Sequence, residues 1–142
     1  MLWRWGTVAG ENFVSISGNL TRDPNLQFTA GGQSYVQLGL AHNARYFKDG
    51  AWVDRQVSFF DVTVWGDLAV NCAESLRRGL RVRVVGRLEY RTWEKDGESF
   101  SKVSIVADDV APSLHFATAL VAKAGRATVE AASNGAAPTS GK

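Results

Sequence analysis

A row of arginines that ends in a tryptophan marks residues 80–93, LRVRVVGRLEYRTW. Leu80, Val82 and Val84 alternate with basic side chains, which is the period of a β-strand with one buried face. The opposite face carries the side chains suited to chemistry: Arg81, Arg83, Arg87, Arg91 and Trp93. Guanidinium groups bind phosphates and indole rings stack on bases. This strand is therefore predicted to bind nucleic acid, with an ordinary solvated face as the alternative.

More aromatic and basic residues surround a predicted hairpin turn at Asp49-Gly50. The flanks of this turn carry Arg45, Tyr46, Phe47, Lys48 and Trp52. So many rings interleaved with charge are unusual in a core, and we expect a hairpin that protrudes from the domain. A secondary set of candidate phosphate ligands consists of Arg22, Arg45, Lys48 and Arg55.

The segment 57–65, VSFFDVTVW, predicts a strand with aromatic rings on its outer face. Phe60, Val62 and Val64 share the core-facing parity, which leaves Phe59 and Trp65 on the other side. We expect both rings to join Trp93 as stacking candidates, with a buried Trp65 as the alternative.

The elements that must position these residues are strands separated by turn signals. Gly31-Gly32, Asp49-Gly50 and Asp96-Gly97 predict turns, and Gly18 and Gly86 stand where the strands of a small barrel must curl. The predicted strands are residues 13–18, 34–43, 57–65, 80–93 and 99–110. A stretch at 114–121, LHFATALV, is ambiguous between a short extra strand and a helical turn.

One short helix is predicted between the third and fourth strands. Asp67 is its expected N-cap, and Gly79 is its stop signal. Cys72 lies on the apolar stripe of this helix, so we expect a buried, inert thiol. This order of elements predicts an all-β fold, a five-stranded OB barrel with one helix between strands three and four. The expected domain limits are a leader at 1–10, the OB domain at 11–111, an extension at 112–124 and a disordered tail at 125–142.

Composition fits a single globular domain with a local basic stripe. The 142 residues carry a net charge of only +2, yet seven of the 16 Lys and Arg residues lie between Arg77 and Lys95. Cys72 is the only cysteine, so an internal disulfide is excluded and a reducing, cytoplasmic location is expected. No apolar run approaches the roughly 20 residues of a membrane span.

Catalysis and metal binding are not expected. His42 and His115 have no Cys or carboxylate pattern around them, and the adjacent Asp108 and Asp109 should point to opposite faces of a strand. We therefore predict no enzyme, no metal and no cofactor.

Five segments carry a resemblance that covers most of residues 12–111, in order and with close to family spacing. They are GNLTRDPNLQFT at 18–29, LGLAHNAR at 38–45, FFDVTVWGDLA at 59–69, SLRRGLRVRVVGRLEYRTW at 75–93 and DG at 96–97. With them the chain resembles the bacterial single-stranded DNA-binding protein family. The segment APSLHFATALVAKA, at 111–124, resembles an extension of actinobacterial members, in which an added strand clamps neighbouring subunits.

The resemblance implies a homotetramer that wraps single-stranded DNA, without cofactor or catalysis, in replication, recombination or repair. The family's stacking positions fall on Tyr46, Phe59, Trp65 and Trp93 of this chain. Tyr46 and Phe59 stand where better-studied members carry Trp, so each ring is kept but its area is smaller.

One departure from the family concerns partner proteins. The usual members end in a short acidic tip that recruits replication and repair proteins, whereas this sequence closes with NGAAPTSGK. We therefore do not expect recruitment by that route, as in a paralogue or a phage- or plasmid-borne version. Two other functions stay open. One is an RNA-binding OB domain, since no residue pattern indicates whether the protein would recognise the 2′-hydroxyl that distinguishes RNA from DNA. The other is an OB module that binds proteins.

Overall fold

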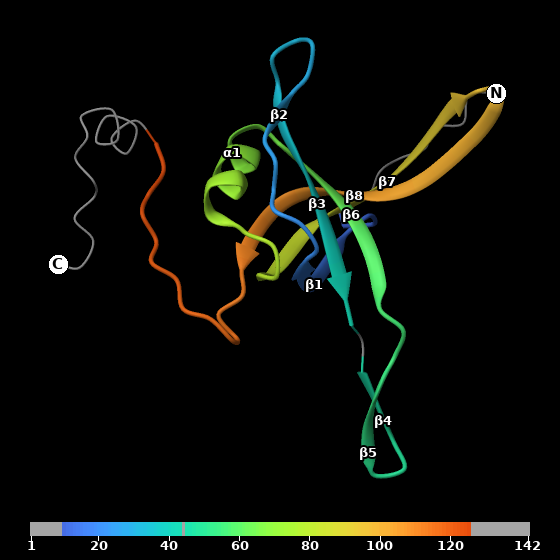
Figure 1. Ribbon diagram of the computed structural model, residues 1–142, viewed down its shortest axis with the longest axis vertical. Helices are drawn as coiled ribbons and strands as arrows, with labels where there is room; N and C mark the ends of the chain where they lie inside the picture. The colour runs from blue at the N-terminus through green and yellow to red at the C-terminus, as the bar shows by residue number, and fades with distance from the viewer. Residues whose placement is uncertain (1–9, 44, 126–142) are drawn as a thin grey trace.

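The computed structural model describes residues 10–43 and 45–125, and five long strands and one helix organise them (Figure 1). The elements in chain order are β1 Val14–Leu20, β2 Gln27–Phe28, β3 Ser34–His42, β4 Arg45–Lys48, β5 Ala51–Asp54, β6 Ser58–Trp65, α1 Gly66–Ser75, β7 Arg81–Lys95 and β8 Glu98–Pro112. The long strands β1, β3, β6, β7 and β8 correspond to the five predicted ones, with boundaries shifted by a few residues.

The long strands form a closed ring. Their order in the sheet is β1-β7-β8-β6-β3, and a second pairing joins β1 to β3 at Asn19–Ala41 and Leu20–Leu40. All these pairs are antiparallel except β6 and β8, which pair in parallel at Val62–Ile105. A five-stranded ring with the helix between its third and fourth strands is the predicted OB barrel, which is thus confirmed.

The core fills the ring and follows the alternation of the strands. The largest fully buried side chains come from four of the long strands: Val36, Leu38, Leu40, Val62, Val64, Val82, Val84 and Ile105. Cross-strand pairs such as Val36–Val64 and Leu38–Val62 place apolar residues on the same inner face. The outer face of β3 and β6 is thereby left for Tyr35, Gln37, Phe59, Asp61, Thr63 and Trp65.

Two glycines allow the strands to approach closely where the ring curls. A Cβ on Gly18 would lie 2.5 Å from the Ala41 carbonyl oxygen, and one on Gly86 would collide with the Val106 carbonyl oxygen. The β7–β8 register also shifts between Val85 and Gly86, which marks a β-bulge. The sequence expectation that these glycines permit curling is confirmed.

The helix α1 begins two residues earlier than predicted, so Asp67 is not its N-cap. Strand β6 runs directly into the helix, which makes Trp65 the cap residue, and no side chain caps the first turn. Asp67 lies within that turn, where its negative charge interacts favourably with the positive end of the helix dipole and stabilises the helix. At the other end, Arg77 Nη1 donates to the carbonyls of Ala73 (3.1 Å) and Leu76 (2.7 Å).

Cys72 lies on the inner side of α1, as expected. Its side chain is only 4% exposed. Burial, with a smaller contribution from the negative charge of Asp109, raises the pKa of the Cys72 thiol to about 11. The thiol is therefore neutral and inert near neutral pH.

Two hairpins extend from the ring (Figure 1). Strands β7 and β8 continue past the ring as a two-stranded arm that ends at Asp96-Gly97, and β4 and β5 form a separate hairpin around Asp49-Gly50. The four turn residues have positive φ, between 52° and 79°, as a tight hairpin turn requires. The predicted protruding hairpin is confirmed.

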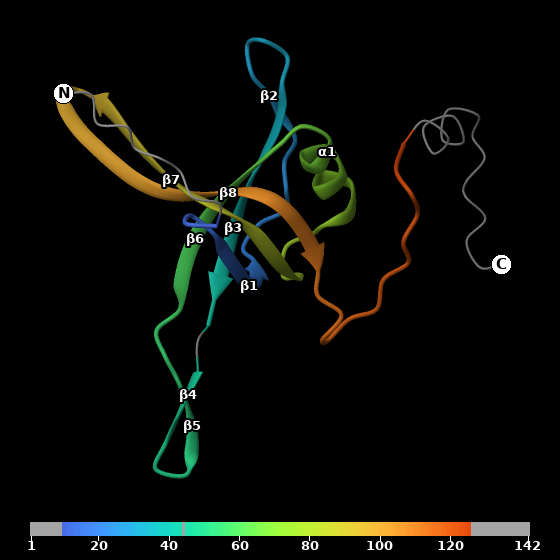
Figure 2. The same cartoon turned by 180° about the vertical axis from the view of Figure 1, so that it is seen from behind.

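Residues 113–125 form neither a helix nor a strand and run away from the barrel on the side opposite the arm (Figure 2). Neither alternative for residues 114–121 is thus present in the isolated chain. The predicted leader, apart from Gly10, and the predicted tail, apart from Gly125, lie outside the described residues. Within the described ranges, no helix is long and apolar enough to cross a membrane.

Candidate nucleic-acid interface

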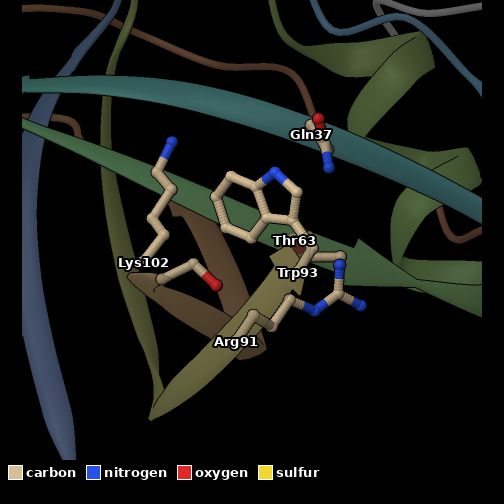
Figure 3. A pocket seen from close by; sticks show the side chains of 6 residues that line it. Gln37, Thr63, Arg91, Trp93 and Lys102 are labelled. Atoms are coloured by element: carbon tan, nitrogen blue, oxygen red, sulfur yellow. The ribbon is translucent and has the colours of Figure 1, made fainter. Parts of the chain in front are cut away.

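A depression of about 260 Å³ opens on the outer face of the sheet formed by β3, β6, β8 and β7 (Figure 3). Six side chains line it: Gln37, Thr63, Arg91, Trp93, Lys102 and Ser104. In Figure 3 the Trp93 indole lies between Arg91 and Lys102, with Gln37 beyond its edge. An apolar ring between two cations is an arrangement that can hold a base and its phosphates.

Strand pairing brings these side chains together. The turn at Asp96-Gly97 sets the register of the arm, so that Arg91 lies opposite Lys102. The parallel β6–β8 pairing brings Thr63 beside this hairpin, and the β3–β6 pairing places Gln37 next to Thr63. The depression is therefore built from four strands, although its two cations come from one hairpin.

Trp93 is held by a second aromatic ring. Phe100 lies opposite it across the arm, with ring centroids 5.8 Å apart and planes inclined by 20°. Trp93 nevertheless remains 45% exposed. One face of the indole is thus supported while surface remains for a ligand.

Trp65 and Phe59 lie on the same outer face of β6, as their parity predicts. Trp65 is half-buried against Tyr35, at 5.3 Å between ring centroids. Phe59, near the other end of β6, is 73% exposed. Trp65 is therefore neither buried in the core nor free, and Phe59 is the more accessible of the two rings.

The β4–β5 hairpin carries Tyr46 and several other candidates. Arg55 lies over the Tyr46 ring, 4.9 Å from its centroid, and Arg45 forms an ion pair with Asp54 at 2.7 Å. Phe47 and Trp52 form an exposed edge-to-face pair, 5.5 Å between centroids. Lys48, beside the turn, is exposed as well.

The row of arginines on β7 does not form one cluster. Arg83 donates to Ser15 on β1 at 3.0 Å, and Arg87 pairs with Asp108 at 3.2 Å. At about 3.3 Å per residue, Arg81 and Arg91 are some 33 Å apart along the strand. The row therefore follows β7 around the barrel, and only Arg91 reaches the depression.

Sequence reasoning did not select four residues that the structure places at this face: Tyr35, Gln37, Phe100 and Lys102. The hairpin signal at Asp96-Gly97 was sufficient to predict the positions of two of them, Phe100 and Lys102. Pairing the residues that flank this turn, step by step, sets Trp93 opposite Phe100 and Arg91 opposite Lys102. The other two required the long-range pairing of β3 with β6.

The groups weighed for catalysis have structural partners. His42 Nδ1 lies 2.8 Å from the Ser17 carbonyl oxygen. Asp108 pairs with Arg87, whereas Asp109 accepts a hydrogen bond from the Val110 amide. Among the described residues, no three His, Cys, Asp or Glu side chains are grouped so as to hold a metal ion.

Comparison with known proteins gives one consistent result. The single-stranded DNA-binding protein of Mycobacterium leprae is 42% identical over 122 residues, covering 84% of this chain and 73% of that protein. That of Paenarthrobacter aurescens is 38% identical over 131 residues, covering 90% and 77%. The crystal structure of the small single-stranded DNA-binding protein from Streptomyces coelicolor superposes with a TM-score of 0.61 at 33% identity, covering 72% of this chain and 94% of that one. Residues 11–113 match the model of the single-strand binding protein family. The chain belongs to the single-strand binding protein family.

Proposed function

We propose that this protein binds single-stranded DNA, without strong sequence preference, along the outer face of β3, β6, β8 and β7 and the adjoining β4–β5 hairpin. The bases stack on four rings, Tyr46, Phe59, Trp65 and Trp93. The phosphates are neutralised by basic side chains on these elements and on the connections beside them, namely Arg22, Arg45, Lys48, Arg55, Arg81, Arg83, Arg87 and Arg91, with Lys102 added from the depression.

The depression at Trp93 carries this proposal. Its indole is supported by Phe100 from one side and flanked by Arg91 and Lys102. Stacking uses the π-face that every base has, and it is therefore tolerant of sequence. In a duplex these faces are covered by neighbouring bases, so exposed rings favour unpaired strands.

The test is a titration of the full chain with labelled oligo-dT, with a duplex of equal length and with oligo-U, each at low and high salt. We expect tight binding of oligo-dT, weak binding of the duplex and affinity that falls steeply with salt, since released counterions drive binding. Equal binding of the duplex and of oligo-dT would mean that this face is only a generic basic surface without preference for single strands. Preference for oligo-U would favour an RNA-binding domain, and no binding would favour a protein-interaction module.

A substitution at the depression tests the stacking role. Trp93→Ala should weaken oligo-dT binding by about 1–3 kcal/mol, the usual contribution of one stacked base. Tyr90→Ala, which removes an exposed ring from the opposite face of the same strand, is the matched control. Equal losses in the two variants would contradict a specific role for Trp93.

We also propose that the protein assembles as a homotetramer and that residues 112–124 clamp neighbouring subunits by adding a strand. Four large apolar side chains of this segment are exposed in the isolated chain: Leu114, Phe116, Leu120 and Val121. Such a row normally marks an interaction surface. Light scattering should give a tetramer for the full chain and a smaller or weaker assembly when residues 114–142 are deleted; a monomeric full chain would contradict the proposal.

The role that fits this activity is protection of single strands during replication, recombination or repair. A protein with this role is expected at the nucleoid, and it needs no cofactor or catalytic group. Crosslinking in cells with single strands exposed by DNA damage should recover the protein on those strands.

A further inference from the structure

An acidic residue lies in the middle of the basic face. Asp61 shares the outer face of β6 with Thr63, which lines the depression, and it pairs across the sheet with Gly39 on β3. Its carboxylate is 38% exposed, so it faces the region through which a DNA backbone would run. A fixed negative charge at this place should repel phosphate.

The carboxylate is engaged with two cations from two other segments. Asp61 Oδ2 accepts a hydrogen bond from Lys102 Nζ on β8, and Asp61 Oδ1 lies 3.9 Å from Arg22 Nη2 in the β1–β2 connection. Both cations stay about half exposed, so they are accessible to a ligand. Two cations that converge on one oxyanion form a site suited equally to a phosphate.

Gly39 keeps Arg22 in this position. A Cβ on Gly39 would lie 2.5 Å from Arg22 Nη1 and 3.2 Å from Arg22 Cζ. The guanidinium therefore lies directly over the backbone of β3, beside Asp61. Arg22 can lie beside Asp61 only because Gly39, which pairs with Asp61 across the sheet, has no side chain. This close approach supports the Arg22–Asp61 contact independently of the ion-pair distances.

We infer that Asp61 is an internal competitor for the DNA phosphate. In the free protein its carboxylate occupies Arg22 and Lys102, and on binding it gives up both cations to the backbone of the strand. The inference rests on the proposed binding of single-stranded DNA. On this account Asp61 lowers the affinity of the protein for single-stranded DNA. Asp61 also holds Arg22 and Lys102 in a position from which they transfer to the DNA phosphates.

The test is the affinity of Asp61→Asn for oligo-dT across a range of salt concentrations. At low salt we expect binding about 3- to 10-fold tighter than that of the wild type, because two exposed ion pairs no longer have to be broken. The slope of log affinity against log salt should stay near the wild-type value, because the slope follows the number of phosphates neutralised in the complex, and Arg22 and Lys102 reach the DNA backbone in both proteins.

Two variants control for charge. Glu74→Gln changes the net charge by the same amount at an exposed position on α1, and it should leave both affinity and slope near the wild-type values. Asp61→Glu keeps the carboxylate and should also resemble the wild type. Thermal melting of each variant shows whether the fold is retained.

A double-substitution cycle tests the release of Lys102 itself. Lys102→Ala should reduce affinity little in the wild type, where Asp61 occupies the amine, and several-fold more in the Asp61→Asn background. Additive effects would overturn the inference. So would a folded Asp61→Asn variant that binds no more tightly than Glu74→Gln. A wild type that does not bind oligo-dT is a different result, because it removes the proposed function before any variant is compared.

Discussion

Phe100 and Trp93 stack across the β7–β8 arm, 5.8 Å apart and inclined by 20°, so the ring at the centre of the depression rests on a ring from the neighbouring strand. Phe100→Ala should therefore weaken oligo-dT binding although Phe100 itself need not touch a base. We expect a loss of about 1 kcal/mol, smaller than that of Trp93→Ala, because the indole remains but is no longer held. Fluorescence anisotropy with labelled oligo-dT measures this. An unchanged affinity would mean that Trp93 needs no support.

Two glycines of the barrel should differ in what they tolerate. A Cβ on Gly86 meets the backbone of β8, which cannot move without opening the sheet, whereas a Cβ on Gly39 meets the ends of the Arg22 and Thr21 side chains. Gly86→Ala should lower the free energy of unfolding by about 1–3 kcal/mol. Urea denaturation should show a clearly smaller loss for Gly39→Ala, and the reverse order would contradict this account.

Asn12 extends the pairing of β1 with β7 beyond its last backbone pair. Its Nδ2 donates to the Leu88 carbonyl at 2.9 Å, and its Oδ1 accepts from the Leu88 amide at 2.8 Å. Asn12→Ala should cost about 1 kcal/mol of stability, because both bonds are exposed and compete with water. Asn25→Ala, an exposed asparagine in the β1–β2 connection, is the control in the same urea experiment. Equal stabilities of the two variants would count against the bridge.

Cys72 should be protected from thiol reagents while the protein is folded. At pH 8 the buried thiol, with its pKa near 11, is neutral and inaccessible, and it should react with an aromatic disulfide reagent only after unfolding. Fast reaction of the native protein would contradict the burial of α1 against the core.

The same raised pKa predicts a loss of stability at high pH. The unfolded thiol ionises near pH 9.0 and the folded one near 11, so the stabilisation it provides is complete below pH 9.0 and is lost as pH rises to about 11. The loss should reach about 2–3 kcal/mol, since one pKa unit corresponds to about 1.4 kcal/mol. Unfolding curves of the wild type and Cys72→Ala should converge over this interval, and parallel curves would rule out this linkage.

The fold was accessible from sequence because its long strands alternate strictly and its turns carry strong signals. Val36, Leu38 and Leu40 on β3 repeat every second residue, and so do the apolar residues of β6. Asp96-Gly97 marks the arm without ambiguity. The start of α1 was harder to predict, because β6 enters the helix without a loop and no side chain caps it.

The site was only partly accessible for a different reason. Parity assigns Phe59, Trp65 and Trp93 to outer faces, and the structure agrees. Parity does not tell which outward residues meet, because a curling strand turns its outer face around the barrel. Arg83 and Arg91 share a parity, yet Arg83 donates to Ser15 on β1 whereas Arg91 pairs with Glu89 on its own strand. The Asp61–Lys102 contact depends on the parallel pairing of β6 with β8, which no local pattern encodes.

That parallel pairing also has a consequence for the order in which the chain is made. Strand β8 closes the ring by pairing with two strands, antiparallel with β7 and parallel with β6. A nascent chain that has not yet released Ile105 from the ribosome leaves the edges of β6 and β7 unpaired, and unpaired edges associate readily with other chains. Barrel closure is therefore a late event in synthesis, and premature termination within β8 would yield a product prone to aggregation rather than a smaller domain.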